Sequence, residues 1–205
     1  MIIGNGFVDL FVKTTSEAAY ASSLLKGKGD KIAADQAAVD KMRLFLNNIP
    51  MKGRIVIGEG EMDEAPMLYI NELVGTGIGE ELDIAVDPLE GTNLTAKNLP
   101  NAMSVLAVSK KDNLLHAPDI YMEKIAVGPT ARGAIDINES PTVNLQRVAD
   151  AKKCYIEDLT VVILDRPRHD KIVDAIRKAG ARIHLITDGD VAPAIAAAVE
   201  GSGEL

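Results

Sequence analysis

The chain has 205 residues, of which 47% are apolar and 25% are charged, a composition typical of a folded globular protein. Thirty acidic against 22 basic side chains give a net charge of −8, which argues against nucleic-acid binding through a basic surface. The apolar runs are far shorter than the ~20 residues that a membrane span needs, and the first residues lack the basic start of a secretory signal. A single cysteine, Cys154, fits a reducing compartment. We therefore expect a cytoplasmic protein with neither a membrane nor a nucleic-acid partner.

The first part of the chain mixes helices and strands. The spacing of apolar residues predicts helices over 7–26 and 31–48, and Asp30 is a candidate cap for the second. A strand at 54–58, an acidic turn and a helix starting near Pro66 are expected next. The remaining predicted elements are strands at 82–86, 103–109, 114–117 and 121–127, and a helix from Pro141 to about Lys153.

The last part of the chain alternates more regularly. Strands are predicted at 160–164 and 182–186, and helices at 171–179 and 191–200, the pattern of a parallel βαβ unit. We therefore expect an α/β protein with an α+β domain over residues 1–155. Residues 156–205 begin a second α/β domain, and a module smaller than roughly 60 residues buries little surface by itself. This second domain is expected to be incomplete within the chain.

Acidic residues follow two of the predicted strands. The first strand leads into Glu59 and Asp63, and the second into Asp87 and Glu90. Ligands of α/β sheets bind at the carboxyl ends of strands. Clustered carboxylates repel one another unless their pKa rises or a hard divalent cation such as Mg²⁺ or Mn²⁺ binds.

Solvated turns that cap the following helices are the alternative, and this interpretation stays open for Glu61 and Glu64. Asp87 and Glu90 favour a site, because Gly91 and the residue after it offer amides to a phosphate oxygen.

Two more charged motifs come directly after strands. Arg166-Pro167-Arg168 offers two guanidinium groups for a phosphate, although Asp165 could simply cap the next helix. Asp188-Gly189-Asp190 offers acceptors for sugar hydroxyls, or a cap for the helix beginning at Val191. From the residues alone, the cap is the favoured interpretation of these two acids.

The sequence Asp87-Pro-Leu-Glu-Gly-Thr92 resembles the metal-binding signature of the lithium-sensitive, metal-dependent sugar and inositol phosphatases. Six ordered blocks closely resemble class II fructose-1,6-bisphosphatases, a family that includes the cyanobacterial-type fructose/sedoheptulose bisphosphatases. These blocks lie at 27–39, 54–70, 81–93, 117–129, 165–173 and 186–195. The resemblance runs from about residue 15 to the last residue and implies a fold of alternating helix and sheet layers.

The resemblance implies an enzyme, a phosphoric monoester hydrolase that uses Mn²⁺ or Mg²⁺ to remove the 1-phosphate of fructose 1,6-bisphosphate. It implies four metal ligands, Asp35, Glu59, Asp87 and Glu90. Three residues are implied in catalysis: Asp63 and Thr92 in activating water, and Lys31 near the phosphate. The implied substrate contacts are Glu90, Gly91, Thr92, Tyr121, Arg166, Pro167, Arg168, Asp188, Gly189 and Asp190.

Other activities remain open at this point. Sedoheptulose-1,7-bisphosphatase and inositol-type phosphatase are alternatives within the same chemistry. A catalytically silent sugar-phosphate-binding module is another, because family members continue through a glycine-rich segment that supplies one more metal-ligand glutamate. The resemblance also implies a homo-oligomer, either a dimer or a tetramer, and a role in gluconeogenesis or glycerol use in a bacterial cytoplasm.

Overall fold

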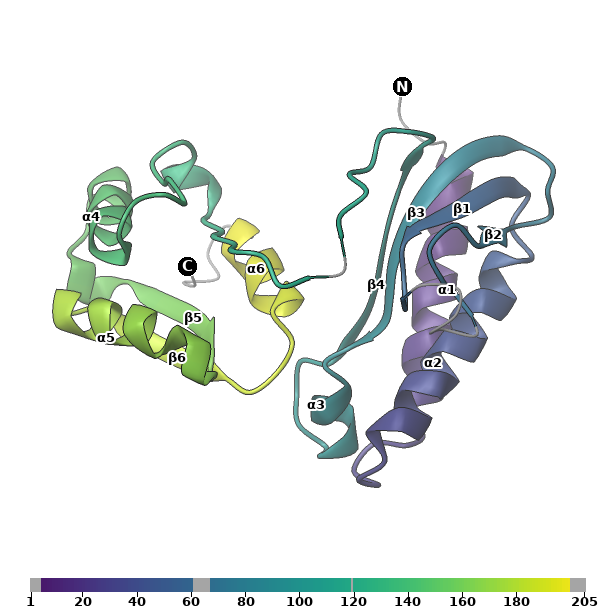
Figure 1. Cartoon of the computed structure of the whole chain (residues 1–205), viewed down its shortest axis with the longest axis horizontal. Helices are drawn as coiled ribbons and strands as arrows, with labels where there is room; N and C mark the ends of the chain where they lie inside the picture. Colours follow the sequence, from purple (N-terminus) through teal and green to yellow (C-terminus); the bar gives the residue numbers. More distant parts are fainter. Residues whose placement is uncertain (1–4, 61–66, 119, 200–205) are drawn as a thin grey trace. The chain divides into compact units, whose positions relative to one another are not determined.

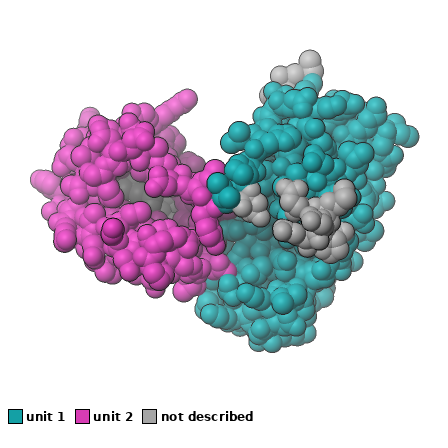
Figure 2. All heavy atoms as spheres, in the orientation of Figure 1, with its two compact units in different colours: residues 1–120 teal, residues 121–205 magenta. Residues whose placement is uncertain are grey.

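The computed structural model describes residues 5–60, 67–118 and 120–199 (Figure 1). The chain divides into two compact units, residues 1–120 and 121–205 (Figure 2). This division lies earlier than the boundary expected near residue 156, because α4 (Pro141–Lys152) packs against α5 (Asp170–Ala179) in the second unit. Compact units and domains need not coincide, so the domains 1–155 and 156–205 stay a prediction.

The first unit combines two long helices with a mixed sheet (Figure 1). The helices α1 (Asn5–Ser23) and α2 (Lys31–Leu46) pack against each other, and both contact the sheet. The predicted cap is confirmed, because the Asp30 side chain accepts a hydrogen bond from the amide of Ala33 at 2.9 Å. The sheet has the order β2-β1-β3-β4, in which β1 and β3 are parallel and the other pairs antiparallel. Its strands are β1 (Met51–Ile57), β2 (Leu73–Val74), β3 (Glu80–Glu90) and β4 (Met103–Lys110).

The hydrophobic core of the first unit lies between these helices and the sheet. Met42 and Leu46 of α2 are fully buried, as are Ile55 of β1 and Ile84 of β3. Each such side chain contributes roughly 1.5–3 kcal/mol when it leaves water. The core therefore fixes α2 and the two parallel strands in one arrangement, and predicted site residues lie on α2 and β3 and directly after β1.

The helix expected from Pro66 onward is wrong for the residues that the structure describes. Residues 67–72 form turns, in which Leu68 has a φ of 54° and Asn71 a φ of 72°. Their backbone bonds to β1 instead of to itself: Asn71 donates to the carbonyl of Ile55 at 2.8 Å, and Ile55 donates to that of Glu72 at 2.9 Å. Leu68 is fully buried, so the apolar spacing here reflects burial in the core.

The second unit contains the predicted alternation of strands and helices. The strands β5 (Thr160–Leu164) and β6 (Arg182–Ile186) are parallel, with α5 between them and α6 (Val191–Ala198) after β6. Three short 3-10 turns complete it: η1 (Pro129–Ala131), η2 (Ile156–Asp158) and η3 (Pro167–His169). Its smaller core includes Leu145, Val148 and Ile176. Each residue of β5 and β6 stays partly exposed.

The strands expected at 114–117 and 121–127 are wrong, because neither segment pairs with a strand in the described part of the chain. Leu115 and Tyr121 illustrate the reason: they are β-prone, yet 77% and 86% exposed. One short helix, α3 (Thr92–Ala96), follows β3. Of the helices that the structure describes, none combines the length and apolar character needed to cross a bilayer.

Candidate active site

An extra residue interrupts both parallel strands of the first unit, in β1 before Glu59 and in β3 between Asp87 and Glu90. In β1, Ile55 and Ile57 pair with consecutive residues of β3. In β3, Asp87 pairs with Val105 and Glu90 with Met103, so three steps on β3 match two on β4. Residues three apart in a regular strand point to opposite faces. The bulge therefore turns Asp87 and Glu90 toward the same face, as bulges beside active sites often do.

The four predicted metal ligands come together in this unit. Asp35 is carried by α2, Glu59 follows β1, and Asp87 and Glu90 belong to β3. All four are partly buried. The Asp87 carboxyl is hydrogen-bonded to that of Glu90 and lies within electrostatic range of Glu59 and Asp35. The sequence-based grouping of these acids therefore matches the fold.

Burial raises the pKa of three of these carboxyls, and neighbouring negative charges add to it for two of the three. Burial raises the pKa of Glu59 to about 7, with a further contribution from the charge of Asp35. Burial also raises the pKa of Asp87 to about 8, helped by the hydrogen bond to Glu90 and the negative charges around it. The pKa of Asp35 is raised by burial as well. Folding thus places several carboxylates where their negative charge is poorly solvated.

Gly58 holds Glu59 in position because no other residue fits there. A Cβ at this point would lie 2.0 Å from the carbonyl oxygen of Leu68. The amide of Glu59 donates to the same carbonyl at 3.0 Å. The buried turn at Leu68 therefore anchors the backbone that carries the Glu59 carboxylate.

The donor set of this cluster consists of carboxylate oxygens, which suit a hard divalent cation such as Mg²⁺ or Mn²⁺. A cation would also relieve the repulsion that raises the pKa values. Within residues 5–60, 67–118 and 120–199, no three acidic, histidine or cysteine side chains are spaced as a formed metal site. The residues therefore fit a cation in chemistry, and the side chains would have to draw together to bind it.

Gly91 and Thr92 follow the acids of β3 directly. Gly91 has a φ of 84°, and a Cβ there would lie 2.8 Å from Leu94, so the turn requires glycine. Thr92 begins α3, which has five residues and thus a weak helix dipole. A phosphate contact at Gly91 and Thr92 would depend on individual backbone amides and the Thr92 hydroxyl.

The two other predicted catalytic residues differ in how they are placed. Lys31 is the exposed first residue of α2, four positions before Asp35, and residues at that spacing share a helix face. Its amine therefore belongs to the side of α2 that carries the acid. Asp63, together with Glu61 and Glu64, lies outside the described residues.

In the second unit, the arginine motif follows β5 and joins its end to that of β6. Arg166 donates to the carbonyls of Thr187 at 2.7 Å and Asp165 at 2.9 Å. The guanidinium of Arg168 lies 4.4 Å from the centre of the Tyr121 ring, a cation–π contact. Asp165 does not cap a helix, because η3 starts at Pro167, with Arg166 before it. The motif thus contacts the end of β6 through Arg166 and the Tyr121 ring through Arg168.

The acids of the Asp188-Gly189-Asp190 motif pair with bases. Asp188 lies 3.9 Å from Arg166, and Gly189 turns the chain with a φ of 76°. Asp190 precedes α6 but makes no capping hydrogen bond. Its carboxylate accepts a hydrogen bond from Lys124 at 2.6 Å instead. The cap favoured from the residues alone is therefore wrong for Asp190.

Lys124 is the functional candidate that the sequence did not reveal. It lies 66 residues before its partner, in a segment without regular secondary structure. Its place in the resembling block 117–129, three residues after Tyr121, was the available signal, and an exposed lysine in a loop carries little information.

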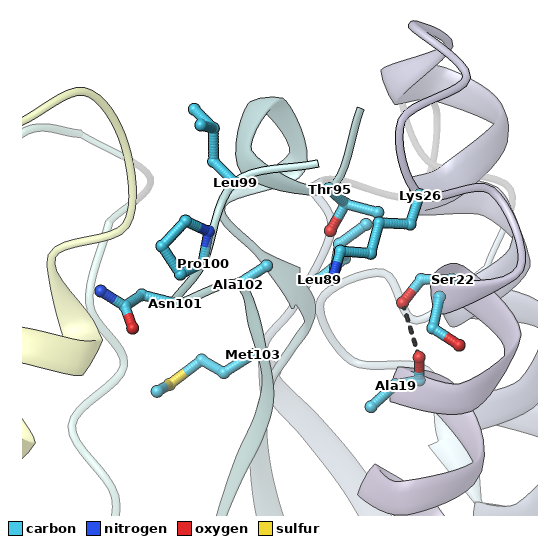
Figure 3. Close-up of a pocket in the computed structure, with 11 residues that line it drawn as sticks. Ala19, Ser22, Lys26, Leu89, Thr95, Leu99, Pro100, Asn101, Ala102 and Met103 are labelled. Carbon is cyan, nitrogen blue, oxygen red and sulfur yellow. Dashed lines mark hydrogen bonds between the residues drawn. The ribbon is translucent and has the colours of Figure 1, made fainter. Parts of the chain in front are cut away.

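The first unit also contains a pocket that other residues line. Ser22 and Lys26 of the α1 end, Thr95 of α3, Leu89 of β3 and Asn101 contribute to its walls (Figure 3). Ser22 donates to the carbonyl of Ala19 at 3.0 Å. Of the predicted site residues that the structure describes, none lines it.

Comparisons with known proteins identify the family of the chain. A family profile described as bacterial fructose-1,6-bisphosphatase, glpX-encoded, matches residues 7–204. Three cyanobacterial relatives are each named D-fructose 1,6-bisphosphatase class 2/sedoheptulose 1,7-bisphosphatase. The protein of Synechococcus sp. (strain JA-3-3Ab) is 50% identical over 94% of this chain. That of Prochlorococcus marinus (strain NATL1A) is 51% identical over 96% of it, and that of Synechocystis sp. (strain PCC 6803) is 50% identical over 93%.

The chain spans 59% of the length of each of these relatives. Both the profile and the relatives cover nearly all of its own residues, including the four acids of the first unit and the charged group of the second. The chain belongs to the family of bacterial fructose-1,6-bisphosphatases encoded by glpX.

Proposed function

We propose that this chain carries the metal-binding residues and a sugar-phosphate-binding group of an enzyme that hydrolyses the 1-phosphate of fructose 1,6-bisphosphate. The products are fructose 6-phosphate and phosphate. The observation that carries the proposal is the convergence of four partly buried acids, Asp35, Glu59, Asp87 and Glu90, of which the first three have a raised pKa. Family membership and the names of the relatives support it.

The four acids would hold Mn²⁺ or Mg²⁺, and the family is one of metal-dependent phosphatases. When bound, the cation neutralises phosphoryl charge and lowers the pKa of water. Asp63 and the Thr92 hydroxyl would orient the attacking water, and Lys31 would attract the phosphate. Most catalysis of phosphoryl transfer comes from such positioning and charge stabilisation.

The second unit would hold the other end of the substrate. Arg168, supported by the Tyr121 ring, and Arg166 would bind the second phosphate, with Pro167 fixing the turn between them. Asp188 and Asp190, on either side of Gly189, would accept hydrogen bonds from sugar hydroxyls. Two guanidinium groups favour a substrate with two phosphates over an inositol monophosphate.

Two alternatives concern the same site. The relatives' names include sedoheptulose 1,7-bisphosphate activity, and this substrate also carries two phosphates. Because the chain spans 59% of the relatives' length, binding of the sugar phosphate without turnover is the other alternative. A homo-oligomer and a cytoplasmic location stay predictions from the resemblance.

Phosphate release from the purified chain tests the proposal. We expect release from fructose 1,6-bisphosphate with Mn²⁺ or Mg²⁺, loss of release with EDTA, and much slower release from inositol 1-phosphate. Faster release from the heptulose bisphosphate would assign the first alternative. A ligand-dependent rise in the melting temperature without release would assign the silent module, because binding to the folded state alone stabilises it.

A further inference from the structure

Asp190 occupies a helix-capping position without capping the helix. Aspartate is a preferred residue at this position, where its side chain usually accepts a hydrogen bond from the second or third amide of the helix. At Asp190 the backbone has φ −95° and ψ −6°, and no such bond is formed. A capping residue ordinarily has extended backbone angles. The local backbone therefore directs this carboxylate away from α6 and toward Lys124.

Lys124 reaches Asp190 from a segment that is held at both ends. At its start, the Tyr121 ring lies against the Arg168 guanidinium. At its end, Gly128 packs so closely on α6 that a Cβ would lie 2.8 Å from the carbonyl oxygen of Ala197. Residues 121–128 otherwise have no regular secondary structure. The ion pair thus joins this segment to the loop that carries Asp190.

Each acid of the Asp188-Gly189-Asp190 motif lies beside one base. Asp188 lies beside Arg166, and Asp190 beside Lys124. The Lys124 side chain is 64% exposed and that of Asp190 39% exposed, so the pair adds little to folding stability. Its electrostatic effect on a nearby anion is larger, because an unpaired carboxylate a few ångströms from a phosphate repels it.

We propose that Lys124 is a positioning residue of the sugar-phosphate site. It holds the Asp190 carboxylate in place for a sugar hydroxyl and cancels its negative charge beside the phosphate that Arg168 binds. This inference rests on the proposed function, since it takes a sugar bisphosphate as the substrate. Lys124 touches neither the reacting phosphate nor the metal-binding acids in this account.

The first experiment compares Lys124→Met with Lys124→Arg in the phosphate-release assay. We expect the methionine variant to raise KM for fructose 1,6-bisphosphate about tenfold and to change kcat less than about twofold. The reason is that the lost interaction stabilises the bound substrate and the transition state equally. The arginine variant should restore KM to within about threefold, since a guanidinium also pairs with a carboxylate.

Lys111→Met is the matched control. Lys111 is also an exposed lysine in an ion pair, 3.1 Å from Glu81 in the first unit, and it has no place in the proposed site. Its kcat and KM should equal those of the unchanged protein. An unchanged KM in Lys124→Met, or an equal rise in the control, would overturn the inference.

A double variant shows whether Lys124 acts through Asp190. In an Asp190→Asn background, adding Lys124→Met should raise KM by less than about twofold, because groups that act through one contact are not additive. A further tenfold rise would mean that Lys124 binds phosphate directly, and the positioning role would be wrong.

Calorimetric titration with fructose 6-phosphate separates the two proposals. If the unchanged protein releases no phosphate, the proposed function fails, yet weaker binding by Lys124→Met than by Lys111→Met still supports the inference. Absence of binding by the unchanged protein, or equal binding by the variants, overturns it.

Discussion

The two units use opposite arrangements of charge. In the first, the acids of the candidate site lie together and partly buried, and burial and mutual repulsion raise the pKa of Glu59 and Asp87. In the second, Asp188 and Asp190 each lie beside a base. Positive charge would stabilise the first arrangement, whereas in the second each of these two acids already has a base as its partner.

The two sheets differ in the same sense. β1 and β3 contribute fully buried residues such as Ile55 and Ile84, and β3 is paired along both edges. β5 and β6 pair only with each other among the described strands, and every residue in them stays partly exposed. A well-packed core thus holds the acids of the first unit, and burial there disfavours the ionised form of Glu59 and Asp87. The comparison gives four predictions.

The largest expected effect is on turnover. Asp87→Asn removes a carboxylate from the centre of the cluster, and we expect kcat/KM with Mn²⁺ to fall about 10²- to 10³-fold or more, because a charge-stabilising group is lost. Asp40→Asn, which changes an acid on the exposed side of α2, is the control and should retain activity. Similar losses in both would show that the cluster has no special role.

The next largest effect concerns a buried ion pair outside the cluster. Asp83 is fully buried and accepts two hydrogen bonds from Arg54, at 3.0 and 3.1 Å. Arg54→Met should lower the free energy of unfolding by about 3–5 kcal/mol, because it leaves a buried charge uncompensated. Denaturant titration followed by circular dichroism measures it. A loss below about 1 kcal/mol would mean that Asp83 is neutralised by other means.

The third prediction uses pH. In the metal-free protein, Glu59 and Asp87 bind protons more tightly when folded, since the pKa values rise from 4.5 to about 7 and from 3.8 to about 8. Their stabilising contribution is complete below the unfolded values and is lost as pH rises through about 7 to 8. We expect a loss on the order of 6 kcal/mol between pH 5 and 8, because one pKa unit corresponds to about 1.4 kcal/mol.

Thermal unfolding in EDTA checks this pH dependence against Asp87→Asn, whose stability should fall less over the same range. Mn²⁺ should restore the unchanged protein at pH 8 and have less effect on the variant. If the two proteins respond to pH in parallel, the cluster is not the source of the dependence.

The smallest effect is expected at an exposed ion pair of the second unit. Arg147 lies 2.9 Å from Glu139, and both side chains are about 40% exposed. Arg147→Met should change the free energy of unfolding by less than about 1 kcal/mol, in contrast to Arg54→Met. A larger loss in the same denaturant titration would show that surface charge stabilises this unit more than its open sheet suggests.

The sequence predicted those parts of the fold that depend on local pattern. The alternation from β5 to α6 follows from apolar periodicity, and Asp30 from capping chemistry. The turn at Leu68 was missed because its hydrogen bonds go to β1, a tertiary interaction that overrides the helical spacing.

In the candidate site, too, local pattern was predictable and contacts between distant segments were not. The four acids were grouped by resemblance and by their place after strands, and the fold brings them together. The bulges that set the direction of these side chains depend on the register between strands. The sequence of a single strand does not specify that register. The contact of Lys124 with Asp190 joins distant segments, so no local pattern could predict it.

Because of the bulge in β3, the site depends on the number of residues between Asp87 and Glu90 as well as on which residues they are. Asp87 and Glu90 face the same side only because one more residue lies between them than between their partners Val105 and Met103. Deleting Leu89 would keep every acid in the chain but remove the bulge, and with it the local bend that sets how the Asp87 and Glu90 carboxylates approach each other. This short stretch should therefore tolerate many substitutions better than a change of length, the reverse of what surface loops usually accept.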